Sequence, residues 1–237
     1  MAHRIDNKRT KSRARRGLVD WVLIVLIVSA MVAMVVYGYF NYYKKWYDVP
    51  AVDAPQAQLL EKPAAKPAQP IGESQPMAMH IPKLGITAGF DDAVCPLTDG
   101  ALNPPTLKTV CYFTAPDRPY TLPSTDSKDV TVVAGHAGAG IPSVLDGLYD
   151  NGYTMDLGDE LLIRTADSGD SWLVYKVTDR HSPDKPELGD DKEIWGEDAT
   201  PGRLLLISCI MPGNPFAQST QNVVLGFEFS GVKQQAA

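Results

Sequence analysis

A cysteine and a histidine stand at the ends of two short apolar runs. Cys209 closes the run over residues 204–209, and His136 follows the run over residues 130–135. Both runs have the length and composition of buried strands. A thiol is a strong nucleophile only as the thiolate, and a neighbouring imidazolium stabilises that anion. The two residues therefore predict nucleophilic catalysis, provided that the fold brings together side chains 73 positions apart.

Each of these residues also has a simpler interpretation. A lone cysteine in an apolar run is most often a small hydrophobic residue, and a lone histidine at a strand end is most often structural. Cys95 and Cys111 lie 16 positions apart and could form a disulfide, which leaves Cys209 as the odd thiol. The chain has neither a Cys-x-x-Cys motif nor a close Cys/His pair, so the sequence predicts no metal site.

The elements that must position Cys209 and His136 are short. From residue 79 onward, apolar or alternating runs are separated by Gly, Pro, Asp and Asn, which predicts an all-β domain, either a barrel or a sandwich. One short helix is expected over Ile141–Tyr149, where apolar residues recur at helical spacing. The expected strands are Met79–Ile81, Ile86–Phe90, Thr109–Thr114, Val130–Ala134, Glu160–Thr165, Ser171–Asp179, Leu204–Ser208 and Val223–Phe229.

An apolar segment precedes this domain. Residues 18–36 are almost unbroken apolar sequence, followed by several tyrosines and a tryptophan. This pattern is typical of a membrane-spanning helix with an interfacial aromatic belt, and we expect an anchor over residues 18–40. The alternative is a cleaved signal peptide, whose apolar core is usually shorter. Basic residues concentrate in the tail 1–17, so we expect a single-pass protein of the cell membrane with this tail in the cytoplasm and the rest outside.

A linker is expected between the anchor and the domain, over residues 41–76. Six prolines lie between Asp48 and Pro76, and such a composition favours extended backbone. The remaining residues, 77–237, are expected to form the catalytic domain. They include 22 acidic and 11 basic residues, a balance of −11, which argues against nucleic-acid binding.

Several motifs make this sequence resemble the sortases, membrane-anchored cysteine transpeptidases of Gram-positive bacteria. The segment 132–136 resembles the strand that ends in their catalytic histidine, and 205–209 resembles the strand that ends in their catalytic cysteine. The resemblance extends over residues 79–229, with the motifs in the family's order. Shorter similarities lie at residues 80–86 and 158–161, and at 99–102 and 222–224, which are reminiscent of class E and F members of actinobacteria.

The resemblance implies a closed eight-stranded β-barrel and a two-step reaction on a C-terminal sorting signal of the LPXTG kind. Cys209 would form a thioacyl intermediate, and His136 would protonate the leaving amine. An amine of a peptidoglycan precursor or a pilin would then resolve the intermediate. The implied partners are surface proteins that carry a sorting signal, and no cofactor is implied. Two alternatives are a hydrolytic cysteine protease on the same barrel and an inactive relative that binds or assembles envelope components.

One position departs from the family's pattern. The family has an arginine near the start of the strand after the cysteine, whereas residues 216–222 contain none. Since one oxyanion donor typically contributes about 10²–10³ in rate, we expect another residue to take its place. The candidate substitutes are Gln218, Gln221, Asn222 and Arg180, with Arg118 as a less favoured one. The long loop before the cysteine strand is expected to shape a substrate groove, with His181 and Trp195 as its contacts.

Overall fold

The computed structural model describes residues 20–39, 64–67, 69–115, 118, 120–138, 142–213 and 217–234. The chain divides into two compact units, residues 1–46 and 47–237. In the first unit, Asp20–Tyr39 forms a helix of 20 residues with a mean hydropathy of 2.5, long and apolar enough to cross a membrane. The expected tail 1–17 and the outermost residues of the expected anchor lie outside the described residues.

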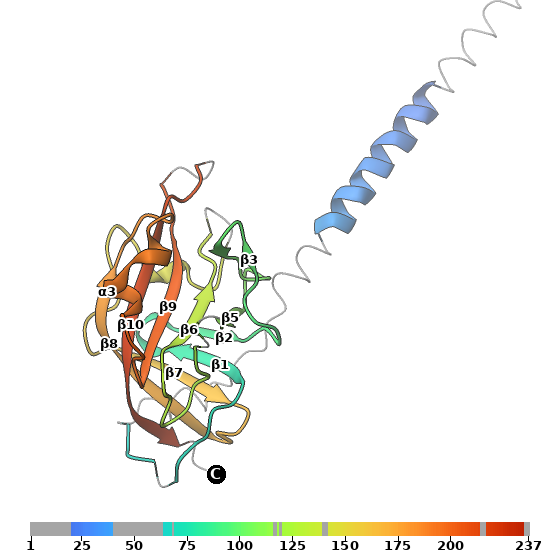
Figure 1. Ribbon diagram of the computed structural model, residues 1–237. Coiled ribbons are helices and arrows are strands. Elements are labelled where there is room, and N and C mark those ends of the chain that lie inside the picture. Colours follow the sequence, from blue (N-terminus) through green and yellow to red (C-terminus); the bar gives the residue numbers. More distant parts are fainter. Residues whose placement is uncertain are drawn as a thin grey trace, which may run out of the picture. The chain divides into compact units, whose positions relative to one another are not determined.

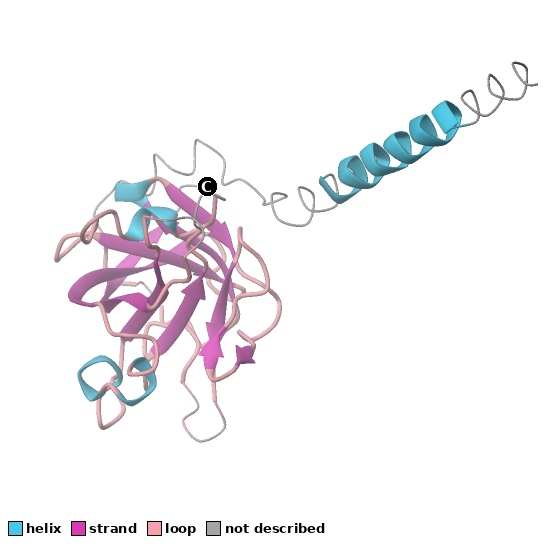
Figure 2. Ribbon diagram, turned by 90° about the horizontal axis from the view of Figure 1, so that it is seen from above, coloured by secondary structure: helices cyan, strands magenta, loops and turns pink. Residues whose placement is uncertain are grey.

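The second unit is built on one sheet of eight strands (Figures 1 and 2). Their order is β2-β1-β7-β8-β10-β9-β6-β5, and all neighbours are antiparallel except β6 and β9. The strands are β1 (Pro76–Ile81), β2 (Ile86–Gly89), β5 (Val110–Phe113), β6 (Thr131–Gly135), β7 (Glu160–Thr165), β8 (Ser171–His181), β9 (Arg203–Ile210) and β10 (Gln221–Gln234).

The two outer strands of the sheet meet and nearly close it into a barrel. Phe90, just after β2, forms a bridge with Val110 of β5, and the Asp91 N–H donates to the Val110 carbonyl at 2.8 Å. The all-β prediction and all eight expected strands are therefore confirmed, with boundaries that differ by a few residues. A small hairpin of β3 (Leu97–Thr98) and β4 (Ala101–Leu102) lies outside this sheet and was not predicted.

Helical structure in the described part of this unit is confined to short segments at its periphery (Figure 2). The expected helix Ile141–Tyr149 is a single 3₁₀ turn, Asp146–Leu148, and Ile141 lies outside the described residues. The α-helix α3 (Lys192–Trp195) was not predicted, because four residues are too few to show a helical period. Its start is fixed by the Asp191 carboxylate, which accepts bonds from the N–H groups of Glu193 and Ile194.

The strands at the centre of the sheet are buried on both faces. Along β9, Leu204 and Leu206 point into the barrel core, whereas Leu205 and Ile207 belong to a second cluster that packs against Ile194 of α3. Residues of β6 and β10 divide between the two clusters in the same alternating way. Burial of both faces explains why these strands read as unbroken apolar runs in the sequence.

The domain begins earlier than the expected boundary at residue 77. Ala65 forms a bridge with Val232 of β10, and Ile71 packs against the barrel core. The hydroxyl of Ser74 bonds to that of Thr165 in β7 at 2.8 Å. The described residues between 64 and 75 are thus attached to the barrel, and the proline-rich composition of the segment concealed these few contacts.

A cluster of charged side chains lies on the outer face of the sheet. The guanidinium of Arg203 donates two bonds of 2.8 Å to the carboxylate of Asp179, to which His181 also donates at 2.8 Å. Burial opposes ionisation of this carboxylate, but the hydrogen bonds from Arg203 and Thr178 outweigh it and lower the pKa of Asp179 to about 2. The carboxylate lies directly over Gly226 of β10, where a Cβ would come within 2.2 Å of an Asp179 oxygen.

We predict that Gly226→Ala lowers the free energy of unfolding by about 1–3 kcal/mol, because the new methyl group must displace the Asp179 carboxylate from Arg203. Urea denaturation of residues 47–237 measures the change. Gly89→Ala in β2 is the matched control, since a Cβ there meets nothing within 4 Å. Equal stability of the two variants would contradict the prediction.

Candidate functional site

A cavity of about 1160 Å³ opens on the outer face of the sheet, where β6, β9 and β10 end or begin. Its floor includes His136, Cys209 and Asn222. One wall is the segment 97–104, which contains the β3–β4 hairpin, and the opposite wall is the segment 185–196, which contains α3.

The parallel register of β6 and β9 brings His136 beside Cys209. Ala134 pairs with Ile207, and the hydroxyl of Ser208 donates to the carbonyl of Gly135 at 2.9 Å. The same register, continued by two residues, sets His136, which directly follows β6, level with Cys209 of β9. Residues two apart share a face, so both side chains project on the side of Ala134 and Ile207, where the cavity lies. Cys209 is a free, half-buried thiol.

The imidazole of His136 is held by the wall of the cavity. Its Nε2 lies 2.8 Å from the backbone carbonyl of Pro104. A carbonyl only accepts hydrogen bonds, so Nε2 carries a hydrogen and Nδ1 is the nitrogen that exchanges a proton. The backbone of His136 is fixed as well, because its carbonyl accepts from the N–H of Leu145 at 3.0 Å. Sequence reasoning missed Pro104, since a backbone carbonyl 32 positions away leaves no signal in the sequence.

Asn222 lies directly opposite Cys209 on β10. Its side chain is buried, and its Nδ2 donates to the carbonyl of Ser208 at 2.9 Å. An amide nitrogen carries two hydrogens, so one N–H of Asn222 remains for another acceptor. Cys209 of β9, Asn222 of β10 and His136, which directly follows β6, therefore lie side by side and line the same cavity.

The other candidate oxyanion donors occupy different places. Gln218 lines the cavity, but Gln221 is exposed, does not line it and projects from the opposite side of β10. Arg180 does not line the cavity either. Its guanidinium lies over the Tyr153 ring, at 5.2 Å from the centroid, and donates to the carbonyl of Met155.

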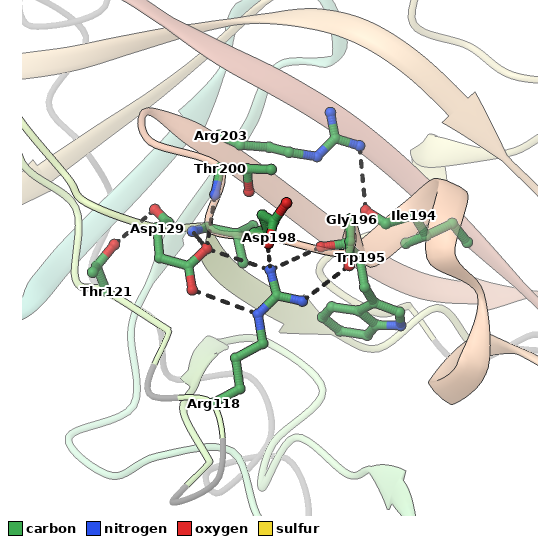
Figure 3. A network of polar contacts seen from close by, with 10 residues as sticks. Arg118, Thr121, Asp129, Ile194, Trp195, Gly196, Asp198, Thr200 and Arg203 are labelled. Atoms are coloured by element: carbon green, nitrogen blue, oxygen red, sulfur yellow. Dashed lines mark hydrogen bonds and ion pairs between the residues drawn. The ribbon is translucent and has the colours of Figure 1, made fainter.

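Arg118 reaches the cavity, but its guanidinium is engaged in a network of hydrogen bonds that joins the end of α3 to Asp129 (Figure 3). It pairs with the Asp129 carboxylate and donates to the carbonyls of Trp195, Gly196 and Asp198 at 2.9–3.3 Å. The N–H of Thr200 also donates to Asp129. Burial opposes ionisation of this carboxylate, but these hydrogen bonds prevail and lower the pKa of Asp129. Arg118 therefore supports the wall.

Of the two residues expected to contact substrate in the groove, Trp195 and His181, only one lies at the cavity. Trp195 lines the cavity and stacks on Tyr120, with ring centroids 5.5 Å apart, and Tyr120 in turn contacts Phe113. These rings give the cavity an aromatic side. His181 does not line the cavity and instead bonds to Asp179 in the charged cluster over Gly226.

Cys95 and Cys111 form a disulfide with Cα atoms 5.1 Å apart. Cys111 lies on β5, and Cys95 lies two residues before the segment 97–104 that forms one wall. The disulfide is buried in the cluster on the outer face and ties the base of this wall to the sheet. The wall carries Pro104, so the disulfide and the orientation of His136 belong to one structural unit.

Within the described ranges, no group of three or more His, Cys, Asp or Glu residues could hold a metal ion. The arrangement offers instead a thiol, an imidazole and an amide donor on the floor of a partly aromatic cavity.

The sequence matches no protein-family model and no curated protein. Solved structures with a similar fold include sortase E1 of Streptomyces coelicolor with a tripeptide in its active site, at 16% identity and a TM-score of 0.47 over 70% of this chain and 94% of that chain. Sortase C-1 of Actinomyces oris is 18% identical, with a TM-score of 0.45 over 78% and 85% of the two chains. Sortase A of Listeria monocytogenes is 16% identical, with a TM-score of 0.44 over 70% and 92%. Since sortases named A, C and E all match, these structures do not distinguish the expected classes E and F from the other classes.

We predict that removing the disulfide by the double substitution Cys95→Ala/Cys111→Ala lowers the free energy of unfolding by about 3 kcal/mol, as expected for a loop closed over 16 positions. Denaturant unfolding of residues 47–237 measures the loss. The Cys209→Ala variant is the control, because Cys209 is free and its removal leaves the disulfide intact. An unchanged midpoint in the double variant would contradict the structural role of the disulfide.

Proposed function

We propose that this chain is a sortase-type cysteine transpeptidase that cleaves an LPXTG-like sorting signal and transfers the protein to an amine of the cell wall or of a pilin. The observation that carries the proposal is the level placement of His136 and Cys209 on the floor of the cavity. A thiol next to an imidazole is the arrangement that nucleophilic acyl transfer requires. The cavity is large enough to hold several residues of an extended peptide.

In the first step, the Cys209 thiolate attacks the carbonyl carbon of the scissile peptide bond, and a carbon–sulfur bond forms. The tetrahedral intermediate collapses, the carbon–nitrogen bond breaks, and the leaving amine takes a proton from His136. The product is a thioester on Cys209. The hydrogen bond from Nε2 to Pro104 holds the ring while Nδ1 gives up its proton.

In the second step, an acceptor amine attacks the thioester carbon and gives a proton to His136. The carbon–sulfur bond breaks and the thiolate is restored. The energy of the acyl bond is conserved in the thioester, so transfer needs no other energy source. The acceptor chemistry fits an amine of a peptidoglycan precursor or a lysine of a pilin.

The intermediate of each step carries a negative oxygen that needs a donor. We propose that Asn222 supplies it in place of an arginine, because it lies opposite Cys209 and has one N–H not engaged with Ser208. Gln218, in the segment before β10, is the second candidate, because it also lines the cavity. A neutral amide stabilises an oxyanion by hydrogen bonding alone, whereas an arginine adds a full charge.

We propose that the helix Asp20–Tyr39 anchors the protein in the cell membrane, with the basic segment before it in the cytoplasm. The domain then lies on the outside, where a disulfide persists. This topology puts the cavity in the compartment that contains exported proteins and cell-wall amines.

The proposal predicts an acyl adduct on Cys209. Residues 47–237 incubated with a panel of LPXTG-type peptides should gain the mass of the N-terminal peptide fragment, as seen by intact-mass spectrometry. Cys209→Ala should abolish the adduct, and His136→Ala should reduce its rate of formation by at least about 10².

Addition of a peptidoglycan-type amine should convert the adduct into the amide product. Hydrolysed peptide as the sole product, with the amine present, would indicate a cysteine protease on the same barrel. If no acyl adduct is detected with any of the peptides, the result would contradict the proposed function.

The oxyanion assignment is tested by two neighbouring substitutions. Asn222→Ala should lower the rate of acylation by about 10²–10³, because the intermediate loses a positioned donor. Gln221→Ala is the matched control and should change the rate little, since this side chain lies outside the cavity. Single-turnover acylation rates measure both. Equal losses, or a loss only for Gln218→Ala, would exclude Asn222 from this role.

A further inference from the structure

Three cations line the described part of the cavity: Arg118, Lys185 and Lys192. The guanidinium of Arg118 is engaged by Asp129 and by three backbone carbonyls. The Nζ of Lys192 is paired with the Glu197 carboxylate at 2.7 Å, on an exposed part of the wall. Lys185 is half-buried, and its ammonium has no hydrogen-bond or ion-pair partner in the structure as described. A partly desolvated ammonium without a counterion is the group in this cavity that is most ready to bind an anion.

The backbone of Lys185 is fixed against β10. Its N–H donates to the carbonyl of Thr220 at 2.9 Å, and the adjacent Asp184 forms an antiparallel bridge with Gln221. The N–H of Asn222 donates to the carbonyl of Pro183 at 3.0 Å, so this segment continues the pairing of β8 with β10. Lys185 thus stands opposite Thr220, two residues before Asn222, and it lines the cavity together with Asn222.

This register sets the separation between Lys185 and the nucleophile. From Cys209, Lys185 lies two strands away and two residues along, which at about 4.8 Å per strand and about 3.4 Å per residue amounts to about 12 Å between Cα atoms. The four-carbon stem of a lysine covers only part of this separation. The ammonium therefore falls short of an oxyanion at Cys209, but it can reach a side chain two or three residues along an extended peptide whose carbonyl is under attack.

The surrounding charges make this position selective. The domain is acidic, with 22 acidic and 11 basic residues from 77 to 237, and Asp190 and Asp191 line the same wall as Lys185. The Asp191 carboxylate is used at the start of α3, and Asp190 is exposed. These groups repel a substrate carboxylate elsewhere on the wall, and among the described residues of the wall Lys185 is the cation left unpaired to compensate it.

Resting on the proposed transpeptidase function, we propose that Lys185 is a specificity-determining residue that binds an acidic side chain of the substrate peptide, two or three residues from the scissile bond. The aromatic side of the cavity, with Trp195 and Tyr120, takes the apolar residues of the same peptide. The preferred substrate is thus a sorting signal with one acidic residue beside its apolar part.

The test uses the full-length chain in detergent and peptides that share one sorting sequence. Each peptide carries Glu, Gln or Lys at one of the three positions on either side of the scissile bond. We expect the Glu peptide to exceed the Gln peptide by about 10- to 100-fold in kcat/KM for acylation at one position, the range for a hydrogen bond to a charged group. Lys185→Gln should remove this preference, and Lys185→Glu should reverse it in favour of Lys. Lys192→Gln, on the same wall but in an ion pair, is the matched control and should retain it.

Equal losses for Glu and Gln peptides in Lys185→Gln would overturn the proposal, because they would assign Lys185 to the reacting centre. Absence of a Glu preference at every position would overturn it too. A second arm measures peptide binding to Cys209→Ala by calorimetry and needs no catalysis. If no acyl adduct forms but Cys209→Ala binds Glu peptides through Lys185, the proposed chemistry fails and the binding inference holds. Equal binding of Glu and Gln peptides would overturn the inference alone.

Discussion

The parallel pairing of β6 with β9 is the constraint on which the site depends. Parallel neighbours cannot be joined by a tight turn, so the chain between them must travel around the barrel through β7, β8 and α3. That path makes two segments, 73 residues apart in sequence, end at the same level. A slip by one residue would turn Cys209 into the barrel core and leave His136 outside it. The alternating apolar contacts on the two faces of β6 and β9 oppose such a slip.

Ion pairs on the outer face of the sheet help to position the helix α3. The Asp179–Arg203 pair and the Arg118–Asp129 pair flank the short helix α3, and both arginines donate to carbonyls at or near its end. A helix of four residues has little stability of its own. Its position, and with it that of Trp195, follows from these charged groups and from the burial of Ile194. Gly226 belongs to the same arrangement, because only a residue without a side chain leaves room for the Asp179 carboxylate.

The strands of the sheet could be predicted from the sequence because a strand buried on one face has alternating apolar residues, and a strand buried on both faces is an unbroken apolar run. The walls of the cavity could not. The β3–β4 hairpin has two residues per strand, and α3 has four residues, so neither reaches one full period. His136 and Cys209 were proposed from their residue types and from the family resemblance, and Asn222 as one substitute for the family's arginine. The separation of Asn222 from Gln221 required the register of β10 with β9. The backbone carbonyl of Pro104 bonds to His136, and among the described residues Lys185 has no hydrogen-bond or ion-pair partner. Neither property is visible in a sequence.

The cavity has a floor of paired strands and walls of loops. The floor is built on the paired strands β6, β9 and β10, whereas the segments 97–104 and 185–196 contribute few strand pairs. Insertions that lengthen a wall, or substitutions that change its side chains, leave the floor intact. During divergence the walls can therefore change faster than the floor, so the proposed choice of peptide can shift while the proposed chemistry at His136, Cys209 and Asn222 stays the same.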